Sequence, residues 1–407
     1  MTASEIKKPF VAIACGGTGG HLFPGLAVAG ELKKRGCEVA LLISPKDVDQ
    51  QAVKSAQGFE IFTLPAVGLQ NRNYFSFAKS FWNSFCASRK IFKQCKPDAV
   101  LAMGGFTSAP PILAARKIGA KTFLHESNTI PGKANRFLSR FVGEAFVGFP
   151  EAAARLKARK VSVTGTPVRP QFFSGAGVSP ANRGQDARAT IGLDPNLPTI
   201  LVMGGSQGAS GLNEMILSAL PLLAGKSWQW LHLTGPNDFE KVKSAYVAAR
   251  IKAVVKPFLA EMDLALGAAT VSVSRAGASS LAEIAAMPLP ALLVPYPAAA
   301  DNHQFFNARA FEKNGAAKLL QQKNSTPEKV AAILSQLIED SSAREKMQAA
   351  LAQWHAPKAA EQIAENILAV CWSSSFSLPE KNRLKPELQR GNRSRSDVTE
   401  RQKFSAA

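Results

Sequence analysis

The sequence lacks paired cysteines and long apolar runs. Its 407 residues include five cysteines, an odd number, and no two of them form a Cys-x-x-Cys pair. This set argues against a disulfide framework or a zinc site and favours reduced thiols. No apolar run approaches the roughly 18 residues that span a bilayer, and the N-terminus does not have the layout of a signal peptide. We therefore expect a protein that is made and kept in the cytoplasm.

Acidic residues are scarce in the first half of the chain. Residues 1–170 hold 24 Lys and Arg against 10 Asp and Glu, whereas residues 171–373 hold 17 against 16. A basic half beside a nearly neutral half predicts an anionic partner, either nucleic acid or a membrane surface. A basic composition without a specific partner is the alternative. The basic half lacks RNP-type aromatic motifs, so we expect no nucleic-acid partner.

Apolar runs typical of buried parallel strands alternate with helical patterns along most of the chain. One series begins at residues 10–15, and a second begins at 199–205 after a polar, Gly- and Pro-rich stretch. The pattern predicts an α/β protein with two Rossmann-like domains. We expect a first domain at 1–170 and a second domain at 171–356, which opens with a linker or insertion at 171–198. A C-terminal helix at 357–371 is expected to return to the first domain. A disordered basic tail is expected at 372–407.

A glycine-rich loop follows the first predicted strand of each half, "GGTGGH" at 16–21 and "GGSQGASG" at 204–211. Glycine lets a ligand approach the backbone, and the free N–H groups at a helix start suit a diphosphate or an oxyanion. The first loop is neither a dinucleotide fingerprint nor a Walker A loop, so tight-turn packing is an equal alternative. Two such loops on two halves favour a cleft between them. His21 at the helix entry is either a general base or a packing residue.

The densest motif of the second half is "SRAGASSLAEIAAMPLPALLVPYP" at 274–297. A small-residue turn leads into a helix that starts near Ser279 and Ser280 and carries Glu283 in its first turns. Glu283 is either a capping-box partner or an acid that accepts both hydroxyls of a ribose.

Seven motifs, in this order and at this spacing, resemble the MurG family of transferases. They are "GGTGGHLFPGLAVA", "GGFTSAP", "HESNTIPGKANR", "GTPVR", "GGSQGASGLNE", the 274–297 segment and "DNHQFFNA". The resemblance runs from about Pro9 to Val370. It implies a GT-B fold with the active site between two domains. It also implies inverting β1,4 transfer of N-acetylglucosamine from UDP-N-acetylglucosamine to the undecaprenyl-diphosphate-linked muramyl-pentapeptide, lipid I, giving lipid II for peptidoglycan at the cytoplasmic face of the cell membrane.

The same resemblance implies roles for individual residues. His21 is the candidate base and Glu126 the runner-up. No cofactor and no essential metal are expected, because Arg169 and helix N-termini can stabilise the leaving diphosphate. The implied substrate contacts are Thr18, Gly19 and Gly20 for the acceptor, Glu283 for the ribose, Ser206, Ala278, Ser279 and Ser280 for the donor diphosphate, Leu259 for the uracil, and Asn128, Arg169 and Gln304 for sugar or diphosphate.

Aromatic residues recur at helical spacing in the segment 73–96, among several cations. The stripe is Tyr74, Phe77, Phe81, Trp82 and Phe85, and the cations include Lys79, Arg89 and Lys90. Such a stripe is either core or an interfacial helix that meets anionic lipid, and a lipid-linked acceptor favours the second.

Two further functions stay open from the sequence alone. One is another GT-B enzyme, such as a UDP-N-acetylglucosamine 2-epimerase or a transferase to a different lipid. The other is a non-enzymatic nucleotide or nucleic-acid binder.

Overall fold

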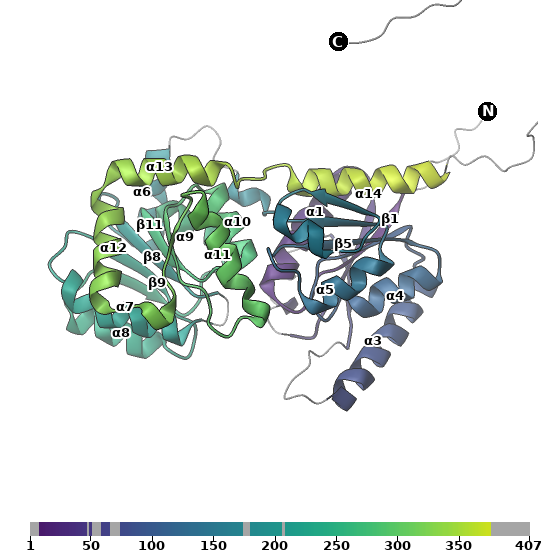
Figure 1. Cartoon of the computed structure of the whole chain (residues 1–407), viewed down its shortest axis with the longest axis horizontal. Coiled ribbons are helices and arrows are strands. Elements are labelled where there is room, and N and C mark those ends of the chain that lie inside the picture. Colours follow the sequence, from purple (N-terminus) through teal and green to yellow (C-terminus); the bar gives the residue numbers. More distant parts are fainter. Residues whose placement is uncertain are drawn as a thin grey trace, which may run out of the picture.

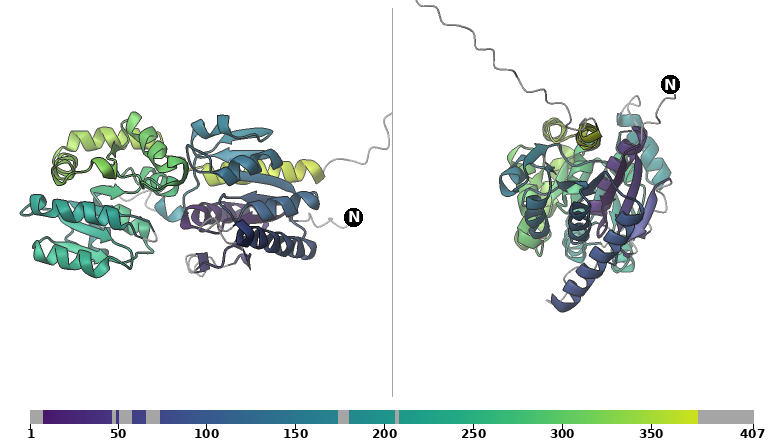
Figure 2. Two further views of the ribbon diagram at one scale, coloured as in Figure 1. Left: turned by 60° about the horizontal axis from the view of Figure 1, so that its bottom comes forward. Right: turned by 90° about the vertical axis from the view of Figure 1, so that its right-hand side faces the viewer.

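Two α/β domains lie side by side in the computed structural model (Figure 1). The structure describes residues 8–46, 49–50, 58–65, 74–173, 180–205 and 208–375. Every strand pairing in both sheets is parallel. This confirms the fold expected from the apolar runs, because strands covered by helices on both faces need apolar side chains throughout. Figure 2 shows the helices on either side of the sheets.

The first domain contains a sheet in the order β3-β2-β1-β4-β5-β6-β7. Its strands are β1 Phe10–Ala14, β2 Glu38–Ile43, β3 Glu60–Thr63, β4 Ala99–Ala102, β5 Lys121–Glu126, β6 Glu144–Val147 and β7 Lys160–Val163. Its helices are α1 Gly19–Lys34, α3 Tyr74–Gln94, α4 Ala109–Lys117 and α5 Lys133–Leu138, with short 3-10 turns at η1 Ser139–Phe141, η2 Pro150–Arg155 and η3 Pro170–Phe172.

The second domain contains a sheet in the order β10-β9-β8-β11-β12-β13. Its strands are β8 Thr199–Met203, β9 Gln229–Leu233, β10 Ala253–Lys256, β11 Val271–Ser274, β12 Ala291–Leu293 and β13 Lys318–Leu319. Its helices are α6 Pro180–Ile191, α7 Ser210–Leu223, α8 Phe239–Ala248, α9 Met262–Ala268, α10 Ala278–Ala286, α11 His303–Lys313, α12 Pro327–Glu339 and α13 Ser341–Ala352, with 3-10 turns at η4 Ala300–Asn302 and η5 Gln322–Asn324.

The strand order fixes where each domain can bind a ligand. It reverses between β1 and β4 in the first sheet and between β8 and β11 in the second. Loops that leave neighbouring strands in opposite directions open a crevice at such a switch point. The loops after β1, β4, β8 and β11 are therefore the ones to search for a site, and all four carry motifs singled out from the sequence.

Two segments lie differently from a simple division of the chain. The last helix, α14 (Ala359–Ser375), crosses back to the first domain, where Ile363, Ile367 and Leu368 join the core beside α1 (Figure 1). The expected linker at 171–198 contains α6, which packs on α9, and Arg188 in α6 donates to the Ala268 carbonyl at 2.8 Å. This half of the stretch is therefore a folded part of the second domain. The tail expected to be disordered from residue 372 begins instead with four residues of α14, because that helix extends to Ser375. The rest of the expected tail, from residue 376, lies outside the described residues.

Helix α3 projects from the body of the first domain, as the lower right of Figure 1 and the right-hand view of Figure 2 show. Its exposed aromatic residues are Phe75, 84% exposed, and Trp82, 63% exposed, whereas Phe77 and Phe81 are half-buried. The prediction was wrong for Phe85, which is only 6% exposed and belongs to the core under α4. The structure describes the backbone of Tyr74 but not its side chain. Within the described ranges, no helix is long and apolar enough to cross a membrane.

Candidate active site

The loops after β1 and β4 meet at His21. A Cβ added at Gly104 or at Gly105 would lie 3.0 Å from atoms of the His21 ring, and both glycines have positive φ. A larger residue at either position would displace the imidazole or strain the backbone. Glycine after β4 therefore makes room for the histidine at the start of α1, at the switch point of the first sheet.

Burial sets the protonation of His21. It lowers the pKa of the imidazole below its ordinary 6.5, and the nearby Glu126 carboxylate opposes this shift only in part. The Met103 carbonyl lies near the ring, but Nδ1 makes no well-oriented hydrogen bond to any described residue. The neutral imidazole is the form that a general base requires.

Glu126, the runner-up base, is occupied by its own loop. Its Oε1 accepts from the backbone N–H and the side-chain amide of Asn128, at 2.8 and 3.0 Å. Its Oε2 accepts from the backbone N–H of Gly132 at 3.0 Å and from Asn135 at 2.8 Å. Four donors and 2% exposure make this carboxylate the organiser of the loop after β5. The geometry favours His21 over Glu126 as the base.

Asp49 anchors the first glycine loop and was not predicted. It is fully buried, and its Oδ2 accepts from the Gly17 N–H at 2.6 Å and from the Ser44 hydroxyl at 2.5 Å. Gly17 has a φ of +112°, so the carboxylate holds the loop in a conformation that only glycine adopts readily. The residue completes the short pattern Asp-Val-Asp at 47–49, whose first two members lie outside the described residues.

Two helix N-termini approach each other across the domain boundary. Thr18 is the N-cap of α1, ahead of Gly19 and Gly20, while Ala278, Ser279 and Ser280 open α10 after the N-cap Gly277. The Ser279 hydroxyl donates to the Gly20 carbonyl at 2.9 Å. Helix starts present free N–H groups and positive dipole ends, so a site between them favours an anion.

Glu283 faces Arg169 of the first domain. The guanidinium is 3.5 Å from the carboxylate, and it also lies 4.0 Å from the centre of the Phe23 ring. Burial raises the pKa of Glu283 to about 7, although the charge of Arg169 opposes the rise. Gly277 is the N-cap of α10, and no side-chain hydrogen bond from a described residue caps that helix start. The capping-box alternative is therefore wrong, and the carboxylate is held at the interface between the domains.

A buried amide joins the loop after β5 to α11. The Asn307 Oδ1 accepts from the backbone and the hydroxyl of Thr129, both at 2.9 Å, and its Nδ2 donates to the Asn128 Oδ1 at 3.0 Å. Asn307 is fully buried. It was missed from the sequence, although it lies one turn after Gln304 in the motif "DNHQFFNA". Gln304 itself accepts from the backbone of Ala276 and of Tyr296, at 3.2 and 2.9 Å.

The structure does not link Leu259 or Ser206 to the other predicted site residues. Leu259 lies in the loop between β10 and α9, half-buried against the core of the second domain. Ser206 falls outside the described residues. The structure thus brings together Gly20, His21 and Ser279 at one point and Arg169 with Glu283 at another, and Asn128 joins the interface through Asn307.

Comparison with known proteins identifies the family. The N-terminal domain of glycosyltransferase family 28 matches residues 11–147, and the C-terminal domain of that family matches residues 199–363. A relative from Anaeromyxobacter sp. (strain Fw109-5), named UDP-N-acetylglucosamine--N-acetylmuramyl-(pentapeptide) pyrophosphoryl-undecaprenol N-acetylglucosamine transferase, is 36% identical over 87% of this chain and 91% of its own length. A relative of the same name from Listeria welshimeri is 33% identical over 88% of this chain and 99% of its own length.

Solved structures agree with this assignment. MurG of Acinetobacter baumannii matches with a TM-score of 0.69 and 28% identity, over 89% of this chain and all of that one. A UDP-GlcNAc 2-epimerase from Neisseria meningitidis matches with a TM-score of 0.66 but only 17% identity, over 89% of this chain and all of that one, which shows a shared fold alone. The chain therefore belongs to glycosyltransferase family 28 and, within it, to the MurG family of N-acetylglucosamine transferases.

Proposed function

We propose that the chain transfers N-acetylglucosamine from UDP-N-acetylglucosamine to the muramyl-pentapeptide of lipid I, forming lipid II for peptidoglycan. One observation carries the assignment of the site. Across the domain boundary, the Ser279 hydroxyl of α10 bonds to the Gly20 carbonyl next to His21. A base and an anion-binding helix start thus lie at the same junction, which a transfer reaction needs.

The proposed mechanism uses the charges of this junction. His21, neutral because of its burial, takes the proton of the acceptor hydroxyl as that oxygen attacks the anomeric carbon. The bond from the anomeric carbon to the UDP oxygen breaks, and the diphosphate leaves with added negative charge. The N-terminus of α10 and the Arg169 guanidinium stabilise that charge, so the proposal requires no divalent metal. Glu283 accepts the ribose hydroxyls of the donor.

The proposal places the enzyme on the cytoplasmic face of the membrane, as a peripheral protein. Its support is the projecting helix α3, where Phe75 and Trp82 are exposed beside Lys79, Arg89 and Lys90. Exposed aromatic residues enter the headgroup boundary of a bilayer, and cations nearby meet anionic lipids. An acceptor held by an undecaprenyl chain requires an enzyme that reaches this surface.

The test is acceptor-dependent release of UDP. The protein is incubated with UDP-N-acetylglucosamine, with and without a short-chain lipid I analogue, and UDP is measured in the presence of EDTA. We expect rapid release only with the acceptor. Epimerisation of the sugar without the acceptor would favour the epimerase alternative, and loss of release in EDTA would overturn the metal-free mechanism.

A further inference from the structure

A pocket lies between the two domains, lined by residues other than those of the proposed active site. Its volume is about 330 Å³, within the range of small-ligand sites. The first domain contributes Thr129 and Ile130 after β5 and Glu151 and Arg155 from η2. The second domain contributes one face of α11, Phe306, Arg309, Ala310 and Lys313, whose spacing places them on a single stripe. None of these residues belongs to the proposed donor or acceptor sites.

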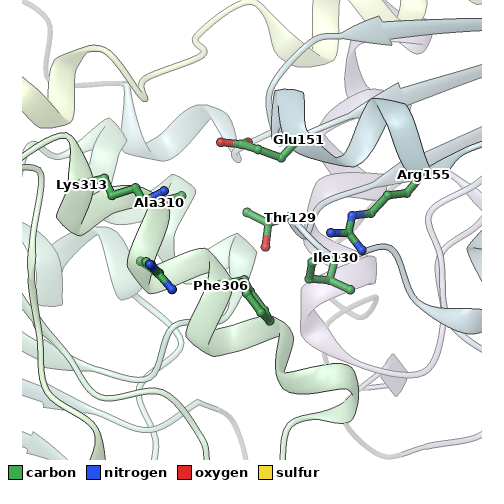
Figure 3. A pocket seen from close by; sticks show the side chains of 8 residues that line it. Thr129, Ile130, Glu151, Arg155, Phe306, Ala310 and Lys313 are labelled. Carbon is green, nitrogen blue, oxygen red and sulfur yellow. The ribbon is translucent and has the colours of Figure 1, made fainter.

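Positive charge dominates the walls of this pocket. Figure 3 shows Arg155 and Glu151 extending from one wall, and Phe306 and Lys313 from the opposite one. Arg155, Arg309 and Lys313 form no ion pair with any residue that the structure describes. The pocket therefore has three cationic side chains and one carboxylate, that of Glu151. The charges of the three cations are not neutralised by ion pairs with described residues.

The side chains indicate the chemistry of the ligand. Arginine guanidinium groups form bidentate hydrogen bonds to phosphate oxygens, and a lysine adds a point charge. Phe306, which is 39% exposed, gives the same pocket an apolar wall. We propose that this pocket binds a small molecule that carries a phosphate or diphosphate group, at a site separate from that of the transfer reaction.

A ligand there would act on the arrangement of the domains. It would contact Arg155 from the first domain and Arg309 and Lys313 from the second. Thr129, which lines the pocket, also donates to Asn307 on α11. A ligand held by both domains stabilises the arrangement in which its contacts are made together. Binding at this pocket would therefore make the domain arrangement seen in the structure depend on the level of a phosphorylated compound.

The test uses inorganic diphosphate as the probe. Isothermal titration of the full chain is done with saturating UDP, which fills the donor site. The pocket variant is Arg309→Gln/Lys313→Gln, and the control is Lys243→Gln/Lys346→Gln, which removes the same charge from exposed positions of the second domain outside the pocket. We expect the pocket variant to bind diphosphate about 10-fold more weakly or worse, from the loss of charge-assisted hydrogen bonds, and the control to match the wild type.

Two further measurements make the result decisive. Arg155→Gln, on the other domain, should weaken diphosphate binding as well, because the ligand bridges both walls. Flotation with phosphatidylglycerol vesicles asks whether the phosphate group comes from a lipid headgroup: loss of flotation in the pocket variant alone would identify that source. Equal behaviour of pocket and control variants in both assays, or no diphosphate binding by the wild type, overturns the proposal. Neither readout depends on transfer activity, so failure here is distinct from failure of the proposed function.

Discussion

At the scale of the residue, His21 acquires its chemistry from two glycines. Gly104 and Gly105 let the imidazole lie against the loop after β4, and burial there lowers its pKa. The sequence indicated a histidine beside flexible backbone, because both lie in one short motif. It did not indicate the second glycine pair as the surface that buries the ring, since 83 positions separate His21 from Gly104.

His21→Ala is expected to lower kcat by about 100-fold or more, because the acceptor hydroxyl loses its base. The KM for UDP-N-acetylglucosamine should change little, since none of the contacts proposed for the donor is made by His21. In the wild type, the fall of kcat on the acid side of its pH profile should have its midpoint below pH 6.5. The lowered pKa of His21 keeps the base neutral at more acidic pH. Steady-state kinetics from pH 5 to 8 measure both. Near-normal turnover of the variant would return His21 to a packing role.

The raised pKa of Glu283 leads to a prediction about how the free energy of unfolding depends on pH. Its pKa of about 7 in the folded protein exceeds the ordinary 4.5, so the folded state holds this proton more tightly than the unfolded chain does. The resulting stabilisation is complete below pH 4.5 and is lost as the pH rises through 7. Glu283→Gln stays neutral at all pH values. At pH 8 its free energy of unfolding should therefore be about 1 to 3 kcal/mol higher than that of the wild type.

Denaturant unfolding at pH 5 and pH 8 checks this expectation. The gain should be smaller at pH 5, where the folded wild type is already protonated. Glu345→Gln, at an exposed position on α13, is the matched control and should change stability little at either pH. A destabilised Glu283→Gln at pH 8 would contradict the account, because it would show that the charged carboxylate is favourable beside Arg169.

At the scale of the element, the helix at 74–94 could be predicted from its period, but its division between surface and core could not. The stripe that contains Phe81, Trp82 and Phe85 is continuous in sequence. In the structure the C-terminal part of α3 packs on α4 and buries Phe85, while the N-terminal part projects. Packing of a neighbouring helix, which the periodicity does not record, sets the boundary.

The projecting part of α3 predicts membrane binding. Phe75→Ser/Trp82→Ser should stay folded, bind anionic vesicles weakly and still use a water-soluble acceptor analogue, because both side chains are exposed. Leu222→Ser/Val247→Ser, at exposed apolar positions of the second domain, is the control and should bind vesicles normally. Vesicle sedimentation at increasing salt is the measurement, and equal binding by both variants would contradict the assignment.

Three elements were not predicted, for identifiable reasons. Strand β3 is an edge strand whose residues are mostly exposed, and β13 is two residues long, so neither leaves a continuous apolar run. Helix α6 lies in a stretch rich in polar residues, and only a few apolar side chains, Ala187 and Ile191 among them, reach the core. Central strands, by contrast, are buried on both faces and are readily predicted.

At the scale of the whole molecule, the two domains meet through polar side chains. Asn307 bonds across to Thr129 and Asn128, and Arg136 pairs with Asp301 at 2.9 Å. The partners are more than 160 positions apart, and no local pattern marks them. The sequence predicted which loops lie at the switch points of the two sheets, because each follows a buried strand. Which loops touch depends on the docking of two sheets, and that only the structure shows.

The most direct test of the account is the structure of the reaction product. The full chain is incubated with UDP-N-acetylglucosamine and a short-chain lipid I analogue, and the product is characterised by mass spectrometry and by NMR of the new anomeric proton. The account predicts one UDP released for each disaccharide formed, with a β1,4 linkage, which means inversion at the transferred carbon. An α linkage, a free or epimerised sugar in place of the disaccharide, or UDP release without the acceptor would contradict it.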